Sequence, residues 1–251
     1  MNYIYFKEGN MDVEKSVRKR VKIIQELLDE TGAKGIVYGN SGGKDSTLVS
    51  ILCKLATENV LGVIMPCGTF LENDNRDAIE FGEIFEIEQK RVDLTEVREL
   101  LLEKINDTVS EESNRNIAPR LRMTTLYAIA QSKGYLVAGT TNRSEALVGY
   151  FTKWGDSGCD FNPISDLTSD EVYAHLKYFA NLKPIPVGIQ TKEPSAGLYE
   201  GQTDEQDLGV SYNAINGYIK GDLISEKDKE KIERYKRLTA HKKRMPFKFL
   251  D

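Results

Sequence analysis

Hydrophobic and polar positions follow two different periods along the chain, and these periods predict a series of helices and short strands. Apolar residues at three- and four-residue steps, from Val13 to Leu28, predict a helix over about 11–30. The same reasoning predicts further helices at about 46–55, 75–85, 94–105, 116–132, 169–179 and 226–243. Strands are predicted at 35–38, 60–65, 88–92 and 135–139. Because strands alternate with helices, we predict an α/β fold whose parallel sheet is covered by helices on both faces.

The second part of the chain differs from the first in composition and in the length of its predicted elements. After Gly149, Gly and Pro become more frequent and the predicted elements shorten. The stretch 192–209 is polar with little periodicity, and it is predicted to be a long loop. A long loop in a compact domain is more often functional than idle. Neither a repeat nor a linker is evident, so we expect a single domain over 1–251.

Composition excludes several classes of protein. Apolar residues make up 40% of the 251 residues and the formal net charge is -5, so a basic surface for general nucleic-acid binding is not expected. No stretch approaches the roughly 20 apolar residues of a membrane span. The three cysteines are too widely spaced to indicate a disulfide framework or a paired-cysteine zinc site. With no signal peptide evident at the N-terminus, we expect a cytoplasmic protein that binds neither nucleic acid nor membrane.

A glycine-rich loop between the first predicted strand and the next helix carries the strongest chemical signal. It reads Gly39-Asn40-Ser41-Gly42-Gly43-Lys44-Asp45-Ser46. Small residues here let backbone N–H groups face a phosphate, and the dipole of the following helix favours an anion. A carboxylate beside a phosphate repels it unless a cation lies between them, so Asp45 predicts a bridging Mg²⁺. The pattern matches neither a Walker loop nor a G-x-G-x-x-G loop, and the remaining alternative is a plain helix-capping turn.

This loop resembles that of the ATP pyrophosphatases, which split ATP into AMP and pyrophosphate while activating an acyl or carbonyl oxygen as its adenylate. The resemblance implies a Rossmann-like sheet of the adenine nucleotide alpha hydrolase type. By itself the loop leaves open GMP synthetase, asparagine synthetase, argininosuccinate synthetase and the tRNA-thiolating enzymes.

Four downstream stretches are similar to the NAD synthetase family and occur in the family's order. They are NIAPRLRM at 116–123, the block 139–160 with GTTNRSE and GYFTKWGD, the block 192–212 that begins KEPSAGL, and the pair His241-Lys242. The likeness runs from about residue 11 to 247. The second and third stretches are far more specific than the glycine-rich loop.

The resemblance implies a ligase that joins deamido-NAD, ATP and ammonia to give NAD, AMP and pyrophosphate, the last step of NAD biosynthesis. A carboxylate is a poor electrophile for ammonia, and adenylation gives the nicotinate carboxylate a good leaving group. Mg²⁺ would neutralise the charge that builds on the pyrophosphate. The resemblance also implies an ATP-binding core at about 33–180, a mobile lid at about 190–208 and a C-terminal helical segment at about 211–245.

Residue roles carried over from the family fall into three groups. Catalysis and Mg²⁺ binding are assigned to Asp45 and Glu145. ATP binding is assigned to Gly39, Asn40, Ser41, Gly42, Gly43, Lys44, Asp45, Ser46, Thr140, Ser169 and Ser195. Deamido-NAD binding is assigned to Arg120, Lys153, Asp160, His241 and Lys242.

Plainer interpretations compete with several of these roles. Arg120 and Arg122 could form a solvated helix face, Lys153 and Asp160 a surface pair, and His241 an exposed position in a charged helix. His175 has no motif around it and is interpreted as structural.

The chain departs from the family at Ser169, where a Lys that contacts the ATP phosphates commonly follows the Leu-Thr pair. One cationic phosphate contact is therefore missing or comes from elsewhere, with Lys44 and Lys192 as candidates. Two other functions remain open at this point. They are another adenylating enzyme of the superfamily, such as one that modifies tRNA, and a non-catalytic nucleotide sensor.

The nitrogen donor and the assembly also follow from the resemblance. Glutamine-dependent NAD synthetases carry a large amidase domain in front, with a nucleophilic Cys. Here the synthetase pattern begins near residue 11, so we expect free ammonia as the donor, with a separate amidase subunit left open. Ammonia-dependent members are homodimers with deamido-NAD near the subunit interface, and the same assembly is implied here.

Overall fold

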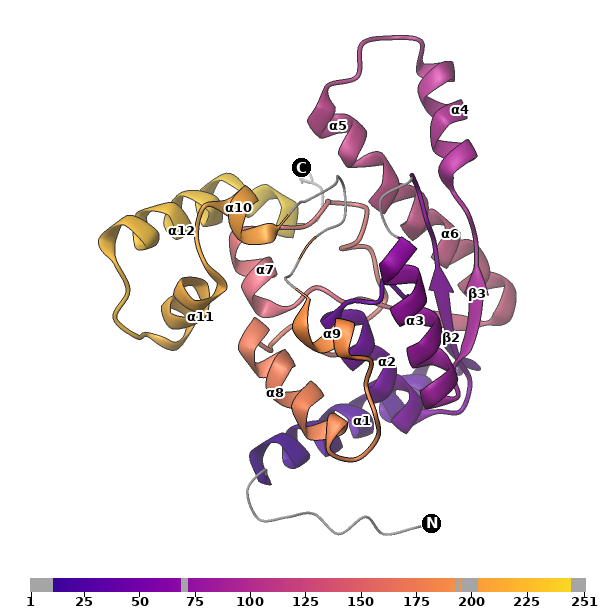
Figure 1. Cartoon of the computed structure of the whole chain (residues 1–251). Coiled ribbons are helices and arrows are strands. Elements are labelled where there is room, and N and C mark those ends of the chain that lie inside the picture. Colours follow the sequence, from indigo (N-terminus) through magenta and orange to yellow (C-terminus); the bar gives the residue numbers. More distant parts are fainter. Residues whose placement is uncertain (1–10, 69–71, 193–194, 196–202, 245–251) are drawn as a thin grey trace, which may run out of the picture.

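A four-stranded parallel sheet forms the centre of the computed structural model, which describes residues 11–68, 72–192, 195 and 203–244 (Figure 1). The strands are β1 (Gly35–Gly39), β2 (Val60–Ile64), β3 (Glu88–Arg91) and β4 (Tyr135–Ala138), in the order β3-β2-β1-β4. All pairings are parallel, and Tyr38 stands opposite Gly62 on one side and Ala138 on the other. The predicted α/β fold with a parallel sheet is confirmed.

The strand order places a reversal of chain direction next to β1. From β1 the chain moves outward to β2 and β3, and it then returns to add β4 on the opposite side of β1. In open α/β sheets, ligands bind outside the carboxyl ends of the strands at such a reversal. The loops that follow β1 and β4 are therefore the expected position of a site.

One face of the sheet packs against a layer of helices from both halves of the chain. These helices are α1 (Met11–Thr31), α2 (Lys44–Ala56), α3 (Glu72–Phe85), α8 (Ser169–Ala180) and α9 (Val187–Thr191). Side chains alternate along a strand, so Ile36 and Tyr38 of β1 point into this layer. They meet Leu48 and Leu52 of α2 and Phe81 of α3 in the largest apolar core.

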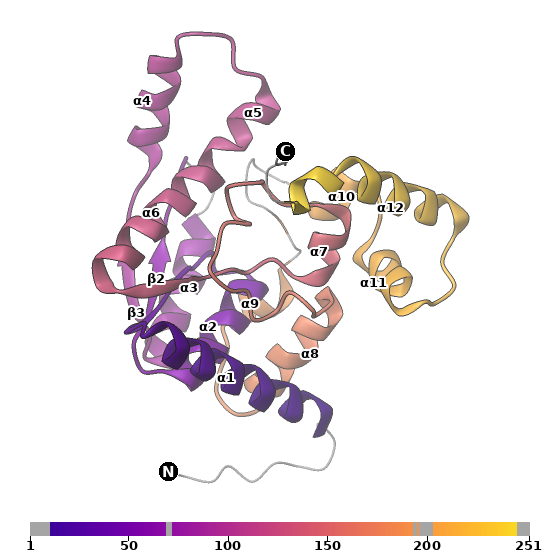
Figure 2. The same cartoon turned by 180° about the vertical axis from the view of Figure 1, so that it is seen from behind.

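The opposite face packs mainly against α6 (Ile117–Lys133), whose Leu126 and Ala130 meet Val37 and Val137. Two further helices, α4 (Thr95–Ile105) and α5 (Glu111–Arg115), project beyond the sheet as an arm (Figures 1 and 2). None of the residues of α4 is buried.

A third group of helices lies to one side of the sheet (Figure 2). It consists of α7 (Arg143–Val148), α10 (Asp204–Leu208), α11 (Tyr212–Lys220), α12 (Glu226–Leu238) and the 3-10 turn Ala240–Lys243. Val148, Ile215 and Ile232 form its own small core. Since α7 follows directly after β4, this group is joined to the end of the strand beside the reversal.

The predicted helices and strands lie within a few residues of the observed ones, with two corrections. The end of the predicted loop at 192–209 is helical, because Thr203 accepts the N–H of Gln206 and caps α10. The predicted lid at about 190–208 otherwise lies largely outside the described residues. The predicted helix over 226–243 ends at Leu238 and continues only as a 3-10 turn. None of the described helices is long and apolar enough to cross a membrane, and all three cysteines are free thiols.

Candidate active site

A cavity of about 680 Å³ opens at the carboxyl ends of β1 and β4, where the chain reverses its direction across the sheet. Its walls include the loop 39–43, the start of α2, the segment 138–141, and parts of α6 and of the segment 149–158. A volume of this size is typical of sites for small molecules and cofactors.

The glycine-rich loop forms one wall of the cavity and turns sharply into α2. Gly42 has a φ of 71°, a left-handed conformation that suits glycine. Asn40 and Ser41 hold the loop in shape, since Asn40 Oδ1 accepts the N–H of Gly42 at 3.3 Å and Ser41 Oγ accepts that of Gly43 at 3.3 Å. Asn40 is itself anchored, because its Nδ2 donates to Gln89 Oε1 at 2.9 Å. The result is a run of backbone N–H groups beside the cavity at a helix N-terminus, a geometry suited to phosphate.

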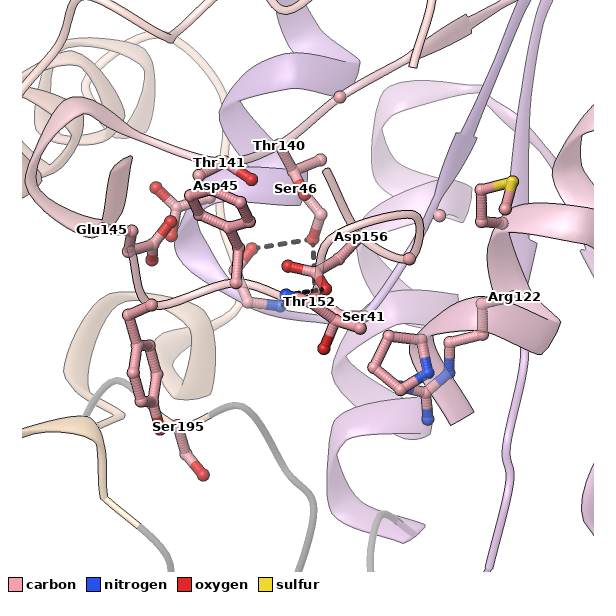
Figure 3. A pocket seen from close by; sticks show the side chains of 18 of the residues that line it. Ser41, Asp45, Ser46, Arg122, Thr140, Thr141, Glu145, Thr152, Asp156 and Ser195 are labelled. Carbon is pink, nitrogen blue, oxygen red and sulfur yellow. Dashed lines mark hydrogen bonds between the residues drawn. The ribbon is translucent and has the colours of Figure 1, made fainter. Parts of the chain in front are cut away.

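Two carboxylates from distant parts of the chain point toward one another within the cavity (Figure 3). Asp45 lies in the first turn of α2, and Glu145 lies in the first turn of α7. Asn142 joins them, because its Nδ2 donates to Asp45 Oδ1 at 3.0 Å and its backbone N–H donates to Glu145 Oε2 at 3.0 Å. Asn142 also caps α7 by accepting the N–H groups of Ser144 and Glu145. The cap of a short helix thus sets the position of both carboxylates.

The environment of the pair disfavours two negative charges. Burial, and then the charge of Asp45, raise the pKa of Glu145 well above its ordinary value of 4.5. A cation between the two carboxylates would relieve both effects. The described residues contain no group of three or more His, Cys, Asp or Glu side chains placed to hold a metal. Two carboxylates with substrate phosphates and water are, however, a usual ligand set for Mg²⁺, so the chemistry of this pair fits that ion.

A buried lysine lies beside the pair. Lys44 Nζ is 2.6 Å from Asp45 Oδ2, and it lies 5.8 Å and 5.6 Å from the ring centroids of Tyr173 and Tyr212. Burial by itself would lower the pKa of Lys44, but the carboxylates of Asp45 and Glu145 outweigh it and the pKa is raised. Lys44 is therefore a permanent cation within the site.

The comparisons with known proteins agree with this geometry. Residues 16–246 match the model of the NAD synthase family. The chain belongs to the NAD synthase family. It is 40% identical over 246 residues to the NH(3)-dependent NAD(+) synthetase of Alkaliphilus oremlandii, an alignment that covers 94% of this chain and 96% of that protein.

Solved structures of the family have the same fold. The NMN synthetase of Francisella tularensis superposes with a TM-score of 0.89 at 32% identity, covering 94% of this chain and 98% of that one. The NH3-dependent NAD synthetase of Campylobacter jejuni superposes with a TM-score of 0.79 at 29% identity, covering 96% and 100%. The adenine nucleotide alpha hydrolase type of sheet that the sequence implied is thereby confirmed.

Most residues assigned to ATP line the cavity. They are Gly39, Asn40, Ser41, Gly42, Gly43, Lys44, Asp45, Ser46, Thr140 and Ser195, and Glu145 lines it as well. Ser169 does not line it. Ser169 is buried in the first turn of α8, where its backbone N–H donates to Ser144 Oγ at 3.0 Å. Both candidates for the missing cation, Lys44 and Lys192, do line the cavity.

Four of the five residues assigned to deamido-NAD gather beside the cavity. Arg120 donates to the carbonyl of Lys153 at 3.4 Å, and Lys153 Nζ donates to the carbonyl of His241 at 2.9 Å. Lys242 Nζ donates to the carbonyl of Phe151 at 3.0 Å. Of the four, Lys242 lines the cavity itself.

Asp160, the fifth residue, has partners at the edge of the sheet. Its carboxylate accepts the N–H of Val137 at 2.8 Å and the hydroxyl of Tyr127 at 3.1 Å. These bonds hold Asp160, which follows the cavity-lining segment 149–158, against β4. Asp160 itself does not line the cavity. The alternative interpretation of Lys153 and Asp160 as a surface pair is wrong, because each of them binds other groups.

Several ionisable residues of the cavity, Arg122 and Asp156 among them, were not assigned a role from the sequence. Arg122 lines the cavity and donates to the carbonyl of Met65 at 3.0 Å, so its interpretation as part of a solvated face is wrong. Asp156 also lines the cavity, accepts the N–H of Thr152 at 2.8 Å, and has a pKa raised by its removal from bulk water. Arg122 and Asp156 lie within the stretches 116–123 and 139–160, which carry the family resemblance. Their place in these stretches is the feature of the sequence that could have indicated a role at the site.

Proposed function

We propose that this protein is an ATP-dependent ligase that amidates deamido-NAD with ammonia and releases AMP and pyrophosphate. The observation that carries the proposal is the pair Asp45 and Glu145, which Asn142 joins at the end of a phosphate-type loop within one cavity. Relatives named NH(3)-dependent NAD(+) synthetases, with about the same length as this chain, support the choice of substrate and of nitrogen donor. The proposal includes Mg²⁺ as the cation and ATP as co-substrate.

Each part of the site has a task in such a reaction. The N–H groups of the loop 39–43 bind the ATP phosphates, while Asp45 and Glu145 hold Mg²⁺, which when bound neutralises charge on the departing pyrophosphate. The adenylated carboxylate is then attacked by ammonia, AMP leaves, and the attacking nitrogen gives up a proton. Asp156 faces the cavity, and its raised pKa suits it to accept that proton.

Product analysis tests the proposal directly. Purified protein is incubated with deamido-NAD, MgATP and either ammonium or glutamine, and NAD and AMP are measured. Formation of both with ammonium alone is the expected result. Bound ATP without NAD from either nitrogen donor would overturn it.

A second acceptor is supported by one comparison. The NMN synthetase of Francisella tularensis superposes on this chain with a TM-score of 0.89, against 0.79 for the Campylobacter enzyme. Nicotinate mononucleotide would present the same carboxylate on a smaller nucleotide. Parallel assays with nicotinate mononucleotide and deamido-NAD, compared by kcat/KM, decide between the two acceptors.

We also propose a cytoplasmic homodimer. The exposed helix α4 carries Val97, Leu100, Leu101 and Ile105 on its surface at helical spacing, each at least 39% exposed. A second copy of the chain would cover such an apolar stripe. Light scattering after size exclusion is expected to give twice the chain mass, and Leu100→Glu is expected to shift it toward the monomer.

A further inference from the structure

The carboxylate of Asp45 already has a partner on each of its two oxygens. Oδ1 accepts a hydrogen bond from Asn142 Nδ2 at 3.0 Å, and Oδ2 lies 2.6 Å from Lys44 Nζ. A divalent cation that binds Asp45 through Oδ2 would therefore have to displace the ammonium of Lys44. Lys44 precedes Asp45 directly, so the two side chains leave the first turn of the same helix.

The side chain of Lys44 is enclosed by other parts of the fold. Its side chain is only 6% exposed, and the rings of Tyr173 and Tyr212, from α8 and α11, lie within 5.8 Å of Nζ. Two elements distant in sequence thus enclose the ammonium next to the carboxylates. By contrast, Ser169, where the family commonly has a phosphate-binding Lys, is buried away from the cavity.

We propose that Lys44 is an internal counter-ion that competes with the divalent cation for Asp45, and that MgATP binding moves its ammonium from Asp45 to a phosphate oxygen. This inference rests on the proposed function for the identity of the nucleotide and the cation. Lys44 then supplies the cationic phosphate contact that Ser169 cannot make. Lys44 and the phosphate-type loop that directly precedes it line the same cavity, so a phosphate bound there would lie on the side of the site that holds the ammonium.

The first experiment measures Mn²⁺ binding to the full-length protein without nucleotide, by electron paramagnetic resonance of the free ion. Loss of the competing ammonium is expected to tighten Mn²⁺ binding by about tenfold or more in Lys44→Gln. Lys192→Gln removes another lysine that lines the same cavity and serves as the matched control. It is expected to change Mn²⁺ affinity by less than about threefold, because it leaves the ion pair between Lys44 and Asp45 in place. Adding Asp45→Asn to Lys44→Gln should abolish the gain, which locates the ion.

The second experiment measures binding of MgATP to the same proteins by calorimetry. Lys44→Gln is expected to weaken MgATP by about tenfold while it tightens Mn²⁺, since it loses a phosphate contact. A lysine that only stabilised the fold would weaken both ligands when removed. Mn²⁺ binding that is unchanged or weaker in folded Lys44→Gln would overturn the proposal.

A second variant and a measurement on the wild-type protein also test the proposal. If Lys44→Gln does not fold by circular dichroism, Lys44→Met retains an apolar stem between the two tyrosine rings. In the wild-type protein, the ammonium resonance of Lys44 should shift on addition of MgATP, and an unshifted resonance would also overturn the proposal. The Mn²⁺ titration uses no acyl substrate. If Lys44→Gln binds Mn²⁺ more tightly and MgATP more weakly, but the wild-type protein makes no NAD, only the proposed function is contradicted.

Discussion

Asn142 and Asp45 are 97 positions apart in the sequence, yet Asn142 Nδ2 donates to Asp45 Oδ1 at 3.0 Å. The same asparagine caps α7 and fixes Glu145 through its backbone N–H. A residue that initiates a helix therefore also spaces the two carboxylates of the site. The stability of α7 and the geometry of the proposed metal pair therefore depend on one residue.

Substitution of Asn142 should separate these two tasks. Asn142→Ala removes both, and we expect a loss of about 1–2 kcal/mol in the free energy of unfolding together with loss of turnover. Asn142→Ser keeps a capping oxygen but has no donor that reaches Asp45. It should therefore unfold near the wild-type midpoint and still lose most activity. Urea unfolding and NAD formation measure the two effects, and full activity in Asn142→Ser would contradict the positioning role.

Neutralising either carboxylate should stop turnover without unfolding the protein. We expect Asp45→Asn and Glu145→Gln to lower kcat by at least about 100-fold, because each removes a proposed ligand of Mg²⁺. Glu145→Gln should keep or raise the thermal midpoint, since the unfavourable charge beside Asp45 disappears. Near-normal NAD formation in both variants would show that the proposed Mg²⁺ site is wrong.

The structural role of His175 predicts a pH dependence of stability. His175 Nδ1 donates to the carbonyl of Glu171 at 2.7 Å, Nε2 accepts from Ser16 Oγ at 2.9 Å, and burial lowers the pKa below its ordinary 6.5. The unfolded chain then binds a proton at a higher pH than the folded one. Stability from this residue is complete above pH 6.5 and is lost as the pH falls through the lowered pKa.

Comparison with His175→Gln isolates this contribution. The difference in unfolding free energy between the wild-type protein and His175→Gln should be constant above pH 6.5 and shrink below it. Denaturant unfolding at a series of pH values measures the difference. A difference that grows on acidification would reverse the assigned sign.

Gly149 should be intolerant of any side chain. It ends α7 with a φ of 70°, and a Cβ there would overlap the side chain of Thr239 at the end of α12. Gly221 ends α11 with a φ of 82°, and its added Cβ would meet no described atom within 4 Å. Gly221→Ala should cost about 1–2 kcal/mol for the backbone alone, and Gly149→Ala should cost at least about 1 kcal/mol more. Equal thermal midpoints for the two variants would contradict the close approach.

The amino-acid sequence by itself determined the order and type of the long elements. Apolar periodicity was enough for α1, which buries one side in the core, and short apolar runs were enough for β1 and β2, which are buried on both faces. The short helices α7 and α10 were not predicted, since one turn and a half of helix has no measurable period and depends on its cap. The family resemblance supplied Asp45 and Glu145, but no local pattern could show what joins them.

Only the tertiary structure decided the contacts between residues distant in the chain. The hydrogen bonds that cap α7 join residues that are close in the sequence. Asn142 also reaches Asp45, because β1 and β4 are neighbours in the sheet. In the same way, Arg120 and Arg122 lie on one helix with the same side-chain type, but only Arg122 lines the cavity, where it donates to the carbonyl of Met65. Ser169 follows the family's Leu-Thr pair, yet its burial against Ser144 was invisible in the sequence. Local propensity acts over a few residues, whereas charge, burial and hydrogen bonding at a site are sums over neighbours that only the folded chain brings together.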